Sequence, residues 1–312
     1  MATNGDTTDH HHHAVIGNAK NFWLYDSRTG FDLTHPPTPD SPPINPRLTL
    51  QTSTTPIAVD PAKTALLVID MQNFFLSPAR GRTKGPGHKA VEQLVQYAVP
   101  AARKAGVRVV WVNWGLSQED IREMPPALLR GFGFDGYKNG KWVGVDRYGK
   151  ITCEDEDGET GMGSWMGMVT DPDDGKEIDA GDFLMRDQWN TALYPPLDRL
   201  YEEGKRLDVR PDVWIHKNRM SGIWSPHTPL AEFLEREGIR TLLFTGVNTD
   251  QCVGGTYQDS FSKGYDCILL NDGCGTTSPE FAQQCIEFNA ELCMGFRTTC
   301  KAFAEGVEAM AK

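Results

Sequence analysis

Three side chains that could act together on a carbonyl carbon follow strand-like apolar runs of this 312-residue chain. Asp70 ends the run 65–69, Lys217 directly follows 213–216, and Cys252 comes shortly after 241–245. Ligands of open α/β sheets gather outside the carboxyl ends of the strands, so we expect the three side chains to meet at one sheet edge. A thiol beside a carboxylate and an ammonium group is suited to nucleophilic catalysis.

Each of these residues also has a simpler interpretation. Asp70 could cap a helix, Lys217 could extend to solvent, and most buried cysteines are inert. The position of Cys252 distinguishes it, because it follows a strand and a Gly turn at the start of a predicted helix, whose positive end favours the thiolate. Asp70 could then take the thiol proton and return it to a leaving amine, provided that apolar surroundings raise its pKa.

The elements that must position these residues form an α/β pattern. After Pro61, short apolar runs alternate with longer helical ones, which is typical of a parallel sheet covered on both faces. We predict a three-layer αβα fold with a central six-stranded, mostly parallel sheet. The predicted strands are 65–70, 107–113, 213–216, 241–245, 267–271 and 296–299, and the predicted helices are 88–105, 228–237, 250–263, 279–292 and 301–311.

Two segments lie outside this pattern. Residues 1–60 contain six prolines between Pro36 and Pro46 and are predicted to be an N-terminal extended arm, whose aromatic patch at 22–25 docks on the body or on a neighbouring subunit. Residues 61–312 form one domain in this interpretation. Residues 115–190 are an insertion without a clear period, which could be a lid over the substrate pocket, a solvated loop or an oligomer contact.

The composition excludes several classes of partner. A formal net charge of −11 disfavours nucleic acid, and no apolar stretch or signal sequence indicates a membrane, so we expect a cytoplasmic protein. None of the seven cysteines is in a CxxC pair, and disulfides are not expected. The tract 10–13 contains four of the eight histidines in a polar terminus that could be disordered or tag-like. We therefore predict no metal site and no cofactor.

Three sequence blocks resemble the isochorismatase-like cysteine hydrolases, a superfamily that includes nicotinamidase, N-carbamoylsarcosine amidohydrolase and ureidoacrylate amidohydrolase. The blocks are TALLVIDMQN at 64–73, HK at 216–217 followed by SGIW at 221–224, and FTGVNTDQCV at 244–253. They occur in the family's order, and the resemblance covers roughly residues 56–305.

The resemblance implies a role for each candidate residue. Asp70 would be the general base, Lys217 would orient it and polarise the site, and Cys252 would attack the amide carbonyl to form a thioester that water hydrolyses. A non-proline cis peptide bond would join Val247 to Asn248. The backbone N–H groups of Asn248 and Cys252 would form the oxyanion hole.

Departures from the pattern narrow the choice of branch. The segment after the second strand, 112–117, has no histidine, which disfavours a metal-dependent nicotinamidase, and true isochorismatases lack the cysteine. An Asn after the second strand, the Trp-x-x-x-Leu at 189–193 and the Ser-Gly-x-aromatic at 221–224 resemble the ureidoacrylate amidohydrolase-like branch. That similarity implies four substrate-binding residues: Gln72, Phe75, Asn113 and Trp224. For the two aromatic residues, core packing is an equal alternative.

The leading hypothesis is a hydrolase that cleaves a C–N bond of a small amide, ureide or carbamoyl compound and releases ammonia or an amine. Two alternatives remain open. One is a metal-independent amidase acting on nicotinamide-like or lactam substrates. The other is a non-catalytic redox or binding protein in which Cys252 is an oxidisable thiol. We also expect a homo-oligomer.

Overall fold

The computed structural model describes residues 11–153 and 160–310 and contains a central six-stranded sheet. Its strand order is β13-β7-β6-β14-β15-β16, and all neighbouring strands are parallel. The six predicted strands are confirmed, and the sheet is wholly rather than mostly parallel. Their bounds are Thr64–Ile69 (β6), Arg108–Trp114 (β7), Val213–Lys217 (β13), Thr241–Val247 (β14), Asp266–Gly275 (β15) and Phe296–Thr298 (β16).

Burial on both faces explains why the central strands are continuous apolar runs. Every residue of β6 is buried, and alternate side chains enter opposite hydrophobic clusters. Leu66 and Val68 belong to one cluster, whereas Leu67 and Ile69 belong to the other. A strand with two apolar faces needs a helical layer on each side, which predicts the three-layer arrangement.

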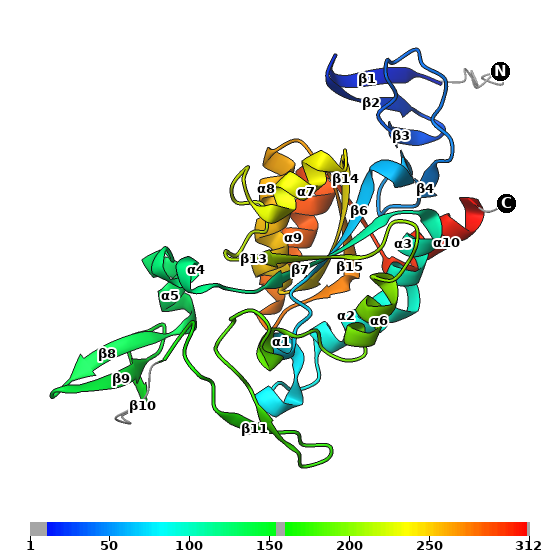
Figure 1. Cartoon of the computed structure of the whole chain (residues 1–312). Helices are drawn as coiled ribbons and strands as arrows, with labels where there is room; N and C mark the ends of the chain where they lie inside the picture. The colour runs from blue at the N-terminus through cyan, green and yellow to red at the C-terminus, as the bar shows by residue number, and fades with distance from the viewer. Residues whose placement is uncertain (1–10, 154–159, 311–312) are drawn as a thin grey trace, which may run out of the picture.

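The two helical layers flank the sheet as predicted (Figure 1). One layer contains α2 (Pro86–Gln93), η3 (Leu94–Ala98), α3 (Val99–Ala105), α6 (Leu197–Gly204) and α10 (Cys300–Met310). The other contains α7 (Pro229–Arg236), η5 (Thr249–Val253), α8 (Gly254–Ser262), α9 (Glu280–Asn289) and η6 (Ala290–Met294). The predicted helix 88–105 is interrupted by the π-helical segment η3.

The N-terminal segment is more ordered than an extended arm. Its strands form a five-stranded sheet in the order β1-β2-β3-β5-β4, and the proline-rich stretch crosses between β3 and β4 without regular structure. Trp23 docks on the body, because its ring lies 5.6 Å from that of Phe296 and its indole N–H donates to Asp266 at 2.7 Å. The bounds are His13–Asn18 (β1), Asn21–Asp26 (β2), Gly30–Leu33 (β3), Leu48–Leu50 (β4) and Ile57–Val59 (β5).

The insertion has regular structure that its sequence did not indicate. It forms a three-stranded sheet, β10-β9-β8, which projects from the body in Figure 1, and a hairpin of β11 and β12. Its buried Leu184 and Met162 join the hydrophobic cluster beneath α7 and α8. Its elements are α4 (Gln118–Arg122), α5 (Pro126–Phe132), β8 (Phe134–Lys138), β9 (Lys141–Val145), β10 (Ile151–Cys153), β11 (Met168–Thr170) and β12 (Glu177–Asp179).

The remaining elements are short. They are η1 (Pro61–Lys63), α1 (Asn73–Leu76), η2 (Pro78–Arg80) and η4 (Trp189–Thr191). Across the described residues, no helix has both the length and the apolar character that a membrane crossing demands.

Candidate active site

Asp70 lies directly after β6 and is completely buried. Its φ of 54° is in the left-handed region, which Asp tolerates better than most residues, and it turns the chain at the sheet edge. The Asp70 N–H donates to the Val112 carbonyl at 2.9 Å, and the Trp114 N–H donates to Asp70 Oδ1 at 3.1 Å. The carboxylate is therefore held against the end of β7.

Lys217 is the last residue of β13 and pairs with Trp114 in the parallel register. Its Nζ lies 3.0 Å from Asp70 Oδ2, and the two side chains are 2% and 0% exposed. The ammonium group also donates to the Arg219 carbonyl at 3.1 Å and lies 3.9 Å from the centre of the Trp114 ring. A buried charge requires such partners, so this pair is the electrostatic centre of the site.

Cys252 lies in η5 and is 6% exposed. Its thiol lies next to the Asp70 carboxyl, and each group shifts the pKa of the other, which brings the third predicted residue to the pair. Burial, with a smaller contribution from the Asp70 charge, raises the pKa of Cys252 to about 12 against the lowering effects of Lys217 and Trp114. The prediction that the helix terminus favours a thiolate is therefore wrong for the resting protein, because desolvation outweighs the attraction of nearby positive charge.

Burial also raises the pKa of Asp70 above its ordinary value. The charge of Lys217 and hydrogen bonds from Cys252 and Trp114 act in the opposite direction without reversing the shift. A carboxylate with a raised proton affinity beside a protonated thiol is suited to general-base catalysis. In the resting protein, these surroundings favour a protonated thiol over a preformed thiolate.

Trp114 is a residue that the sequence analysis did not identify. Its backbone N–H donates to Asp70, its ring lies under the Lys217 ammonium, and its indole N–H lowers the pKa of Cys252. That indole nitrogen is buried and has no hydrogen-bond partner among the described residues. Trp114 thus lies beside all three members of the triad. The sequence feature that could have indicated this residue is its position as an aromatic side chain at the end of a strand next to a candidate site.

Comparisons with known proteins agree with this architecture. Residues 168–307 match the family model of the Isochorismatase domain. The fold is isochorismatase-like. Among solved structures, a cysteine hydrolase from Pseudomonas syringae pv. phaseolicola 1448A is similar at 17% identity and a TM-score of 0.53, over 86% of this chain and 100% of that chain. The nicotinamidase PncA from Bacillus subtilis is similar at 18% identity and a TM-score of 0.52, over 76% of this chain and 99% of that one.

The cis peptide bond implied by the resemblance joins Val247 to Asn248 in this isochorismatase-like fold. Gly246 precedes it in β14 and is paired with Ile69 of β6. Its φ is 122°, and a Cβ there would lie 2.0 Å from the Ile69 carbonyl oxygen, so only glycine fits. The oxyanion hole formed by Asn248 and Cys252 stays a prediction.

The predicted substrate-binding residues have different environments. Asn113 is completely buried, and neither its side-chain nitrogen nor its oxygen has a hydrogen-bond partner in the described part of the chain. Gln72 donates both amide hydrogens inside the protein, at 2.8 Å to the carbonyls of Trp114 and Thr191, and its Oε1 accepts from the Trp114 N–H. Gln72 therefore positions Trp114, and its N–H groups are already occupied.

The two aromatic candidates differ in exposure. Phe75 is half-buried against Phe74, with ring centres 4.8 Å apart. Trp224 is 49% exposed, and its indole N–H donates to Asn218 at 3.1 Å. Their placement is compatible with either a pocket wall or ordinary packing.

The insertion reaches the residues that surround the triad. The ring of Phe132 lies 5.7 Å from that of Trp114, and the ring of Phe183 lies 4.9 Å from that of Phe74. Aromatic side chains of the insertion, which lies between β7 and β13, therefore pack beside the carboxyl edge of the central sheet.

Proposed function

We propose that this protein is an isochorismatase-like cysteine hydrolase that cleaves a C–N bond of a small amide, ureide or carbamoyl compound. The observation that supports this most directly is the buried Asp70–Lys217 pair at 3.0 Å, in contact with the Cys252 thiol. A structural cysteine needs neither a carboxylate nor an ammonium group beside it. The arrangement instead provides a nucleophile, a base and a fixed positive charge.

In the proposed reaction, Asp70 accepts the thiol proton as Cys252 attacks the substrate carbonyl carbon. The N–H groups of Asn248 and Cys252 stabilise the resulting oxyanion. Collapse breaks the C–N bond, the leaving nitrogen takes the proton from Asp70, and an acyl thioester remains on Cys252. Water, deprotonated by Asp70, then hydrolyses the thioester to an acid and restores the thiol. Lys217 holds the carboxylate in place throughout.

Asn113 supports a substrate that contains an amide or ureide group. Asp70 forms hydrogen bonds with the backbone of Val112 and Trp114, so Asn113, which lies between them on β7, is next to the proposed base. A buried amide left without partners costs about 1–3 kcal/mol for each unsatisfied group. A ligand with its own N–H and C=O would satisfy both ends of Asn113, which agrees with the ureidoacrylate amidohydrolase-like resemblance.

The deciding experiment compares wild-type protein with the Cys252→Ser variant on a panel of ureides, carbamoyl acids, primary amides, nicotinamide and lactams after treatment with a chelator. The matched control is Cys267→Ser, since Cys267 is equally buried but lies near the start of β15. We expect mass spectrometry to detect an acid and ammonia or an amine for wild type and the control only. Turnover by Cys252→Ser at the wild-type rate would refute the mechanism.

The same panel separates the alternatives. Preferential hydrolysis of nicotinamide or a lactam would favour the second amidase activity. No turnover of any compound on the panel by a folded protein would favour a non-catalytic role.

We also propose a homo-oligomer, with α9 and η6 as the contact. Phe281, Phe288 and Leu292 are 70%, 63% and 67% exposed, and Cys285 between them is exposed as well. Their 4-3-4 spacing places them on one helical face, as at helix–helix interfaces. Light scattering should give a multiple of the 34.7 kDa chain mass for wild type and a lower mass for Phe288→Lys. Equal masses for the two proteins would reject this surface.

A further inference from the structure

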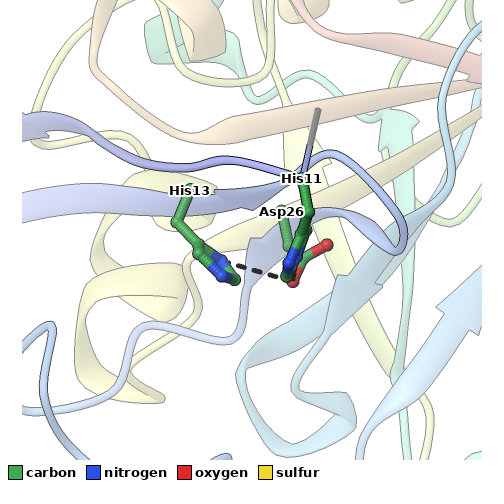
Figure 2. A group of neighbouring side chains, drawn as sticks. All are labelled: His11, His13 and Asp26. Carbon is green, nitrogen blue, oxygen red and sulfur yellow. Dashed lines mark hydrogen bonds and ion pairs between the residues drawn. The ribbon is translucent and has the colours of Figure 1, made fainter. Parts of the chain in front are cut away.

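Two histidines and an aspartate converge on the N-terminal sheet, far along the chain from the triad (Figure 2). His13 begins β1 and is paired with Asp26 of β2 in the antiparallel register. His11 precedes it by two residues and reaches the same carboxylate oxygen. The tract that its sequence suggested to be disordered or tag-like is thus ordered at 11–13, with alternate side chains directed at Asp26.

The distances suit a small metal ion. His11 Nε2 lies 3.1 Å and His13 Nδ1 lies 3.3 Å from Asp26 Oδ2, and all three ligand atoms lie within 4.8 Å of one another. Ligand atoms bound tetrahedrally at 2.0–2.1 Å from zinc are separated by about 3.3 Å. The three groups therefore need little movement to share one ion.

Backbone N–H groups fix the orientation of the Asp26 carboxylate. Asp26 Oδ1 accepts hydrogen bonds from the N–H groups of Arg28 at 2.7 Å and Thr29 at 3.3 Å. These bonds fix the carboxylate so that Oδ2 faces both imidazoles. Ligands held by a second layer of hydrogen bonds bind metals more tightly than free ones.

We propose that His11, His13 and Asp26 form a binding site for a divalent transition metal, with Zn²⁺ as the best match. Two imidazoles and one carboxylate are a common zinc ligand set, and the partial exposure of the site leaves a fourth position for water. β1 is an edge strand whose residues are all exposed, and a bound metal would stabilise its pairing with β2. This inference does not depend on the proposed hydrolase activity.

The test is calorimetric titration of the full chain with Zn²⁺, using Asp26→Asn, His13→Ala and His12→Ala. Asp26→Asn keeps an Oδ1 acceptor for the backbone bonds but removes the charged ligand. His12 is the matched control, because it belongs to the same tract but not to the cluster. We expect zinc affinity to fall at least about tenfold in the first two variants and to stay unchanged in the control.

Hydrogen exchange gives a second readout. Zn²⁺ should slow amide exchange in β1 and β2 of wild type and the His12→Ala variant, and not in Asp26→Asn. If all three substitutions weaken binding equally, or if Asp26→Asn binds like wild type, the metal is bound by the histidine tract without a formed site, and the proposal is wrong.

Discussion

Replacement of Lys217 by methionine isolates the electrostatic centre of the site. Methionine keeps the length of the side chain and its contact with the Trp114 ring but removes the positive charge that lies 3.0 Å from Asp70 Oδ2. Because the partner carboxylate is 0% exposed, it would be left as an unpaired buried charge. Breaking a buried pair in this way costs about 3–5 kcal/mol, and we expect the free energy of unfolding at neutral pH to fall by that amount.

The loss should depend on pH. The pKa of Asp70 is already raised from 3.8 by burial, and removal of the ammonium group would raise it further. An acid whose pKa is higher in the folded state stabilises that state most below its unfolded pKa, and this contribution disappears as the pH rises through the folded pKa. The deficit of Lys217→Met should therefore be smallest near pH 4 and increase toward neutral pH.

The assay is urea denaturation followed by tryptophan fluorescence at several pH values. Lys104→Met is the matched control, since its ion pair with Glu308 is 47% and 66% exposed and should contribute no more than about 1 kcal/mol. The double variant Asp70→Asn/Lys217→Met removes both charges and should be more stable than the sum of the single losses predicts. A pH-independent loss below about 1 kcal/mol for Lys217→Met would refute the reasoning.

Three further predictions concern the chemistry. The value of kcat/KM should rise with pH through a pKa above 3.8, because Asp70 must be ionised to accept the thiol proton, and a flat profile from pH 4 to 8 would contradict its role. Iodoacetamide should label Cys252 far more slowly in the resting protein than after denaturation in urea, as measured by peptide mass spectrometry, because the thiol is buried and its pKa is about 12. Trp114→Phe keeps the backbone N–H that donates to Asp70 but gives Lys217 a weaker aromatic partner, so kcat/KM should fall about 2- to 5-fold, from a loss of about 0.5–1 kcal/mol of cation–π attraction. Unchanged kinetics would remove Trp114 from the site.

The protonation state of the site shows the limit of reasoning from local sequence. A cysteine at the start of a helix indicates a lowered pKa, yet in the structure burial raises the pKa of Cys252 to about 12. Desolvation depends on what packs around the thiol, and those groups come from β6, β7 and β13. Gln72 is a similar case, because its amide binds carbonyls 42 and 119 residues away.

The sequence by itself determined the six strands of the central sheet and the positions of Asp70, Lys217 and Cys252 at its carboxyl edge. Strands buried on both faces must be continuous apolar runs, and a polar residue at the end of such a run is conspicuous. Only the tertiary structure decided that Trp114 contacts all three, that residues 13–59 form a sheet, and that Asp26 meets two histidines. Those features depend on short strands and on side chains distant along the chain, and no local periodicity encodes them.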